Sequence, residues 1–150
     1  MITLKFMQKT KKEIKYEKFL KHALTKGFYN KQVKKLEKEC DVLWSLAVRN
    51  NCKCELCGQV GDIKSFDAHH IRGRAHKATR HDLDNGACLC KGCHRYKIHT
   101  DTFTVGALIE RLKERRGLEW WKQLNIKSCV IWKPTLKDIE KIKEELTKLI

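Results

Sequence analysis

The sequence predicts an α+β fold in which a small strand, loop, strand and helix unit lies between helical segments at both ends of the chain. Two CxxC pairs 32 residues apart bracket the unit, and apolar residues recur at helical spacing before residue 50 and after residue 102. We therefore expect a basic helical N-terminal region over 1–50, a core over 51–102, and a helical C-terminal region over 103–150 packed on that core.

The two CxxC pairs predict a structural zinc site. Cys54 and Cys57 form the first pair, and Cys90 and Cys93 form the second. Four thiolates with this spacing are typical of a tetrahedral zinc ion that ties two distant segments together. Cys52 and Cys88 each lie two residues before a proposed ligand, so a shifted ligand register stays open.

The N-terminal region predicts two helices. Residues 10–26 carry an apolar stripe that Gly27 is expected to end, and a second stripe predicts a helix over 31–49. Four lysines of the second helix are candidates for contacts with a phosphate backbone, and a solvated helix face is an equally good interpretation: Lys31, Lys34, Lys35 and Lys38.

The core predicts a ββα unit. The segment IKSFDAHHI is expected to be a strand whose alternate side chains place His69 and His70 on opposite faces. A polar, basic loop over 73–84 follows, and Asn85-Gly86 is a turn signal. ACLC then predicts a second strand, and KGCHRYKIHT predicts a helix that carries His94. Gly58, directly after Cys57, is expected to adopt a conformation that a bulkier residue cannot.

The C-terminal region predicts helices over 105–117 and 136–149, with a short aromatic segment, GLEWWKQLN, between them. Trp120 and Trp121 have two possible roles, stacking on unpaired bases or packing against the ββα unit, and we favour packing.

The composition favours a polyanionic partner. The formal net charge is +15 in 150 residues, and lysine and arginine that neutralise phosphates release condensed counterions, so nucleic acid is a better candidate than a membrane. Simple solubility is the alternative explanation. Eight cysteines are also compatible with a secreted disulfide framework, but the first residues, MITLKFMQKTKK, lack the apolar core of a signal peptide. We therefore expect reduced thiols and a cytoplasmic protein.

The central motif resembles the HNH endonuclease family, in its zinc-ribbon form common in phages and mobile elements. The resemblance covers roughly residues 40–100, and it is carried by the two CxxC pairs and four further residues: His69, His70, Asn85 and His94. It implies a ββα-metal (His-Me finger) fold and metal-dependent hydrolysis of DNA phosphodiesters. A zinc-stabilised module whose histidines only complete the fold is the competing interpretation.

The resemblance also implies roles for these residues. His70 would be the general base that activates a water, because a neutral imidazole suits this task near neutral pH. His69 and His94 would hold one catalytic cation, Mg²⁺, Mn²⁺ or another divalent ion. Asn85 would bridge the loop by hydrogen bonds and hold His70, or else touch the metal; we prefer the first role.

Other side chains near the motif are candidates for supporting roles. Asp67 is a candidate to accept a proton from the second ring nitrogen of His69. His99 is an open candidate for a third ligand, because it follows His94 by five residues, about 140° round an ideal α-helix. Arg72 and Arg74 are candidates for neutralising phosphate charge. We expect the remaining histidines to be exposed or to contact the backbone: His22, His76 and His81.

Two classes of function fit these features. The leading hypothesis is a DNA endonuclease that nicks as a monomer, the slightly favoured state, or cuts both strands as a dimer. The second is a zinc-ribbon DNA-binding or packaging accessory protein without catalysis. His70 separates them, because a protein without catalysis has no chemical reason to keep a general base.

Overall fold

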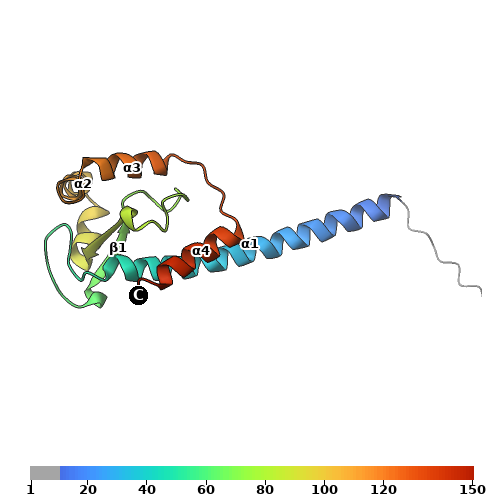
Figure 1. Ribbon diagram of the computed structural model, residues 1–150, viewed down its shortest axis with the longest axis horizontal. Helices are drawn as coiled ribbons and strands as arrows, with labels where there is room; N and C mark the ends of the chain where they lie inside the picture. The colour runs from blue at the N-terminus through green and yellow to red at the C-terminus, as the bar shows by residue number, and fades with distance from the viewer. Residues whose placement is uncertain (1–10) are drawn as a thin grey trace, which may run out of the picture.

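A long helix dominates the shape of the protein. The computed structural model describes residues 11–150, and α1 (Lys11–Arg49) is 39 residues long. Its N-terminal half extends away from the body, whereas its C-terminal half lies beside α4 (Leu136–Thr147) and reaches the small sheet (Figure 1). The region predicted as helical over residues 1–50 is helical from residue 11 on, and residues 1–10 lie outside the described part.

The predicted break at Gly27 is wrong. α1 runs through this glycine without interruption, and no atom lies within 4 Å of the position that a Cβ would occupy there. A glycine inside a helix costs about 1 kcal/mol relative to alanine, which weakens the helix but does not end it. Strong helix formers lie a few residues away on each side, Leu20 to Leu24 before Gly27 and Lys31 to Leu36 after it, and one helix forms where the sequence predicted two.

The predicted ββα unit is confirmed. β1 (Phe66–His70) pairs antiparallel with β2 (Gly86–Cys90), and His70 lies opposite Gly86. Residues 63–65, predicted as strand, form a 3₁₀ turn instead, because the Asp62 side chain accepts the Lys64 amide hydrogen and caps the turn. The helix that follows β2 is a π-helix, η3 (Cys93–Ile98).

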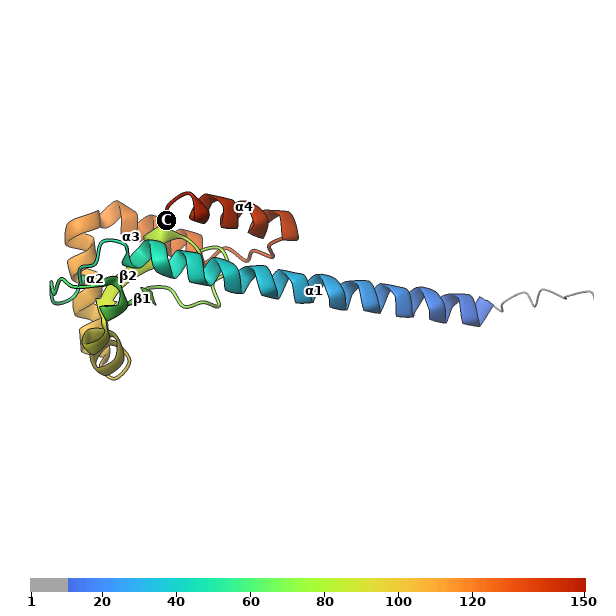
Figure 2. The same ribbon diagram turned by 90° about the horizontal axis from the view of Figure 1, so that it is seen from below.

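Three helices follow the ββα unit. α2 (Thr102–Arg116) ends at Gly117, whose φ is 89°, and α3 (Leu118–Ser128) begins directly after it. α4 begins with a capping box formed by Thr135 and Asp138. α2 and α3 lie at the end of the body that holds the sheet, and α4 runs along α1 (Figure 2).

Two groups of buried side chains hold these elements together. The first joins the strands, the cysteine pairs and α2 through residues that include Phe66, Leu89, Leu108 and Leu112. The second lies between α1 and α4. The C-terminal region is therefore divided, with α2 packed on the ββα unit and α4 packed mainly on α1.

Gly86 permits the close approach of α1 to β2. Its φ is −96°, which any residue can adopt, so the backbone does not require glycine here. A Cβ at this position, however, would lie 2.3 Å from a methyl carbon of Val48 on α1. The turn signal in the sequence thus marks a packing constraint.

We predict that Gly86→Ala destabilises the fold. The added methyl group must push α1 from the sheet, and overpacking of this kind typically costs about 1–3 kcal/mol. Urea denaturation would measure the loss. Gly106→Ala is the matched control, because Gly106 is exposed in α2 with no atom within 4 Å of a new Cβ, and it should leave stability unchanged or raise it. Equal stability of the two variants would contradict the packing argument.

Candidate active site

Four cysteines converge at one end of the sheet. The sulfur atoms of Cys54, Cys57, Cys90 and Cys93 all lie within 4.8 Å of one another. Cys57 Sγ and Cys90 Sγ are 3.8 Å apart, and a tetrahedral ion about 2.3 Å from each sulfur requires a separation of about 3.8 Å. Cys52 and Cys88 are not in the cluster, so the proposed ligand register holds. The four cysteines are positioned to bind zinc.

The turn over residues 51–61, which carries Cys54 and Cys57 and is called the zinc knuckle below, has backbone features that favour metal binding. Gly58 has a φ of 79°, as its place after Cys57 predicted. Burial raises the pKa of the Cys54 thiol, but hydrogen bonds from the backbone at Cys57, Cys90 and Leu56 outweigh this effect and lower the pKa to about 7. The amide of Cys93 also donates to Cys90 Sγ over 3.4 Å. These amides favour the thiolate form that zinc binds.

A second cluster consists of His69 on β1, His94 on η3, and His99 directly after η3. One ring nitrogen from each lies within 4.8 Å of the others. Residues five apart would diverge on an α-helix, but η3 is a π-helix, in which hydrogen bonds join residues i and i+5. The wider turn brings His99 beside His94, and their Nε2 atoms are 3.3 Å apart.

The geometry of these histidines fits a shared cation. Two imidazole nitrogens that are each about 2.0 Å from one ion stand about 3.3 Å apart in a tetrahedral arrangement. His94 Nδ1 lies 3.2 Å from Asp67 Oδ2, and a carboxylate can only accept, so His94 Nε2 keeps its lone pair for a metal. Asp67 thus contacts His94, whereas the sequence analysis paired it with His69.

His70 points away from this cluster, as the strand alternation predicted. Its ring stacks on the Trp44 indole, with centroids 3.8 Å apart and planes inclined by 17°. His70 Nε2 lies 2.9 Å from the Arg80 carbonyl oxygen. Since a carbonyl only accepts, Nε2 carries the proton and Nδ1 keeps the lone pair. Burial lowers the pKa of His70 to about 4, so the ring is neutral at neutral pH.

His69 is also neutral. Burial, followed by the charges of His94 and His99, lowers the pKa of His69 to about 4. A neutral imidazole is the form that coordinates a metal, so this ring can act as a ligand without losing a proton at neutral pH.

Asn85 is fully buried and bridges the loop between the strands. Its Oδ1 accepts the Arg72 amide hydrogen over 2.6 Å, and its Nδ2 donates to the carbonyls of Arg72 and Thr79, each over 2.9 Å. The Thr79 carbonyl belongs to the residue before Arg80, whose carbonyl holds His70. Asn85 is therefore placed to shape the loop around His70, and it does not enter the histidine cluster.

The predicted phosphate-binding residues occupy different environments. Arg74 borders a cleft of about 480 Å³ that also contains Arg49, Asp67, His94 and His99. Arg72 instead lies over the Trp121 ring, 5.0 Å from its centroid. The four lysines of α1 are exposed: Lys31, Lys34, Lys35 and Lys38.

The tryptophans of α3 both contact other parts of the protein. Trp120 packs against the core, and its Nε1 donates to the Asp84 carbonyl over 3.2 Å. Lys113 Nζ lies 5.5 Å from the centroid of the Trp121 ring, on which Arg72 also lies. These contacts favour the packing role over base stacking.

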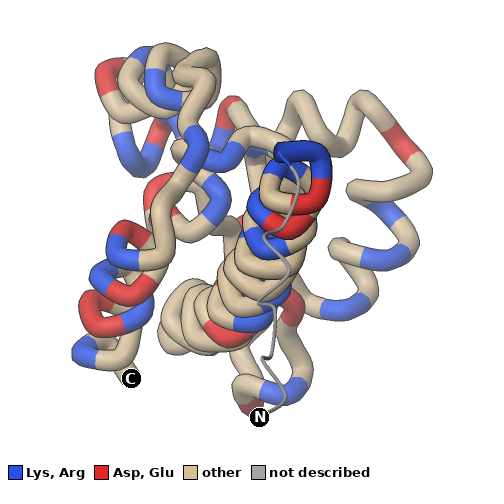
Figure 3. Tube along the Cα trace, turned by 90° about the vertical axis from the view of Figure 1, so that its right-hand side faces the viewer, with Lys and Arg blue, Asp and Glu red and all other residues tan. Residues whose placement is uncertain are grey.

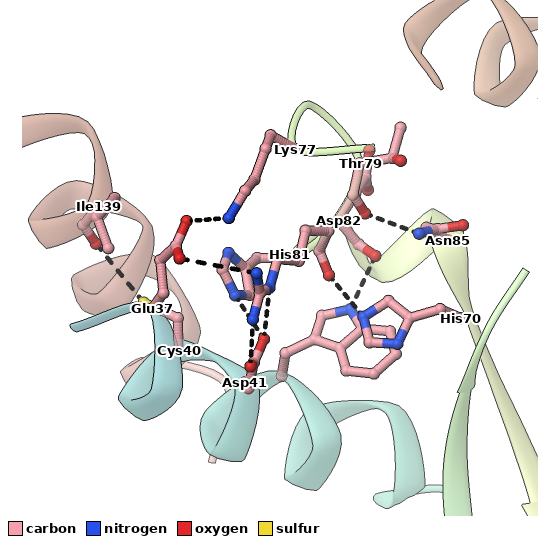
Figure 4. Close-up of polar contacts among 12 residues, drawn as sticks. Glu37, Cys40, Asp41, His70, Lys77, Thr79, His81, Asp82, Asn85 and Ile139 are labelled. Carbon is pink, nitrogen blue, oxygen red and sulfur yellow. Dashed lines mark hydrogen bonds and ion pairs between the residues drawn. The ribbon is translucent and has the colours of Figure 1, made fainter. Parts of the chain in front are cut away.

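Two acidic residues of α1 that the sequence did not single out hold the loop between the strands. Asp41 accepts two hydrogen bonds from the Arg80 guanidinium, over 2.9 and 2.7 Å, and lies 2.9 Å from His81 Nε2. Glu37 pairs with Lys77 over 2.5 Å (Figure 4).

The expectation of a solvent-exposed or backbone-contacting His81 is wrong, because its ring is 6% exposed and its partner is a carboxylate. His76 does contact the backbone, at the Ser128 carbonyl, and His22 is exposed.

The ββα unit brings together two clusters that could hold metal ions, one of four cysteines and one of three histidines. Residues 54–100 match the model of the HNH endonuclease family, which confirms the resemblance over that segment and indicates nuclease activity. No curated protein and no solved structure matches the chain. None of the helices within residues 11–150 has the length and apolar character that crossing a membrane requires.

We predict that Cys90→Ser removes zinc and lowers thermal stability. Structural zinc contributes about 10–16 kcal/mol of apparent binding free energy in small zinc domains, so losing one of four ligands should lower Tm by roughly 10 °C or more. Elemental analysis and thermal denaturation would measure both effects. Cys129→Ser is the control, because Cys129 is exposed and outside the cluster. Folded wild-type protein without zinc would refute the assignment.

Proposed function

We propose that this protein is a metal-dependent HNH endonuclease that hydrolyses DNA phosphodiester bonds. The observation that carries the proposal is that the two adjacent histidines of β1 face opposite sides of the strand and have different surroundings. His69 faces a three-histidine cluster that suits a cation, and His70 faces the opposite side with Nδ1 available as a base. A purely structural zinc module has no use for this second arrangement, since its metal site is complete with four cysteines.

His70 acts as the general base in the proposed mechanism. Its protonated Nε2 stays on the Arg80 carbonyl, so Nδ1 takes the proton from the attacking water. Asn85 keeps the loop that carries this carbonyl in place. A divalent cation held by His69, His94 and His99 would supply positive charge at the phosphoryl oxygens and the leaving 3′ oxygen. Asp67 orients His94 as a ligand.

One face of α1 provides a path for DNA into the cleft. Lys31, Lys34 and Lys38 are followed at further intervals of seven and four residues by Ser45 and Arg49, which border the cleft beside Arg74. Intervals of three, four and seven residues repeat on one side of a helix. Lysine and arginine also recur over the rest of the trace (Figure 3), which supports phosphate contacts with little sequence preference.

The proposed reaction is a nick. One base and one cation site suit one strand, so a monomer should open supercoiled plasmid into circles and leave 5′ phosphate and 3′ hydroxyl ends. Cutting both strands would need two copies. The grouping of four cysteines in a cluster suited to zinc supports action in a cytoplasm, and the family resemblance supports a phage or mobile-element origin. The core for this activity is proposed as residues 51–102.

We predict that His70→Ala lowers plasmid nicking in Mg²⁺ or Mn²⁺ by about 10²–10⁴-fold with little change in DNA affinity, because general base catalysis has this value. His69→Ala and His94→Ala should also weaken binding of the divalent ion. The readouts are nicking with and without EDTA, DNA binding, and metal titration.

His22→Ala is the control for these variants, because His22 is exposed on α1. Nicking by His70→Ala at the wild-type rate would refute the assigned base. Tight DNA binding without any cleavage by wild-type protein would favour the accessory DNA-binding function instead.

We also predict that replacing Lys31, Lys34 and Lys38 with glutamine weakens DNA binding and its salt dependence. Each lost phosphate contact should reduce the slope of log affinity against log salt by about 0.9, so three contacts would change it by about 3. Replacing Lys15, Lys18 and Lys26 removes the same charge from a different face of α1, and Lys18 lies about 200° round the helix from Lys38. Equal effects of the two triple variants would contradict a DNA path along the first face.

A further inference from the structure

The environment of His70 comes largely from α1, outside the matched segment 54–100. Trp44 lies flat against one face of the imidazole and is 1% exposed. Its own Nε1 donates to the Asp82 carbonyl over 2.9 Å. The indole therefore cannot rotate without breaking a hydrogen bond to the loop, and it fixes the plane in which the His70 ring lies.

The edge of the same ring is held by the loop. His70 Nε2 donates to the Arg80 carbonyl, and the Arg80 guanidinium makes a two-point pair with Asp41, three residues before Trp44 on α1. In Figure 4 the Asp41 carboxylate and the loop groups meet on the side of α1 that faces His70. The carbonyl that sets the His70 tautomer thus belongs to a residue whose side chain is anchored to α1.

The Asp41 carboxylate is suited to this anchoring. Burial alone would raise its pKa, but hydrogen bonds and charge from Arg80 and His81 hold the pKa of Asp41 below its ordinary value. The carboxylate is therefore ionised at neutral pH, and Arg80, whose side chain is 16% exposed, keeps a charged partner. Two-point arginine–carboxylate pairs fix orientation as well as distance.

We infer that Asp41 and Trp44 are positioning residues for the general base: Trp44 fixes the plane of the His70 ring, and Asp41, through Arg80, fixes the carbonyl that keeps the proton on Nε2. This inference rests on the proposed function of His70. Without the carbonyl, the neutral ring would divide between two tautomers, and in one of them Nδ1 carries a proton and cannot accept another. The loss should therefore appear in the rate of cleavage and not in DNA affinity.

The test compares variants of the full-length, zinc-loaded protein. Asp41→Asn keeps the size of the side chain but weakens the pair, and Arg80→Lys keeps the charge but cannot make the two-point contact. We expect each to lower the single-turnover nicking rate by about 10-fold or more, with DNA affinity within about 2-fold of wild type. The ¹⁵N resonances of the His70 ring should shift from a pure Nε2–H form toward a mixture of tautomers.

Trp44 is tested by a pair of substitutions. Trp44→Phe keeps an aromatic face against His70 and should retain more activity than Trp44→Leu, which offers no such face. Glu39→Gln is the control, because Glu39 lies on the same helix, pairs with Lys143 of α4 over 2.7 Å, and does not contact the loop. Glu39→Gln should leave both the rate and the His70 resonances unchanged.

The outcomes separate this inference from the proposed function. Folded Asp41→Asn and Arg80→Lys proteins with wild-type rates and an unchanged Nε2–H form would overturn the positioning role. Thermal denaturation identifies any variant that fails to fold, and the more conservative Arg80→Lys then decides. If wild-type protein does not cleave DNA, the proposed function fails, but a change of tautomer in Asp41→Asn would still establish the link from α1 to His70.

Discussion

The close packing of α1 across the two strands is the contact on which the rest of the structure depends. A two-stranded sheet is marginally stable by itself in water, and β1 and β2 have only five residues each. Helix α1 supplies Trp44 against His70 and Val48 against Gly86, where a single methyl group would not fit. The four cysteines fix the other end of the strand pair. The catalytic histidines proposed here are thus presented on strands held between a helix and a zinc knuckle.

The basic residues fall into two groups, those that pair with carboxylates of the protein and those that are exposed. Two basic residues of the loop, Lys77 and Arg80, form ion pairs with Glu37 and Asp41 of α1. Arg116 of α2 likewise pairs with Glu55 beside the zinc knuckle. Partly buried pairs of this kind specify how elements meet more than they add stability. The exposed positive charge that remains for a polyanion includes the lysines of α1 and Arg74 at the cleft.

The sequence predicted the elements whose signal is local. The CxxC spacing located the cysteine cluster, and alternation along β1 placed His69 and His70 on opposite faces. Six residues are too few for apolar spacing to distinguish a π-helix from an α-helix, so the sequence did not predict the turn that brings the Nε2 atoms of His94 and His99 to 3.3 Å. Asp41 and Trp44 were read as part of an amphipathic helix, since their partners lie about 40 residues away in a loop without periodicity.

These long-range contacts also explain why the matched segment is not a complete site. Residues 54–100 contain His70 and both clusters that could hold a metal ion. The Trp44 ring that stacks on His70 lies on α1, and the Arg80 residue whose carbonyl contacts the His70 ring is paired with Asp41 of α1. A general base is effective only when its lone pair is directed at the proton it removes. A ring held by one carbonyl can still tilt, and a ring stacked on one indole can still exchange tautomers. Only the two restraints together, both anchored on α1, leave His70 Nδ1 in one orientation.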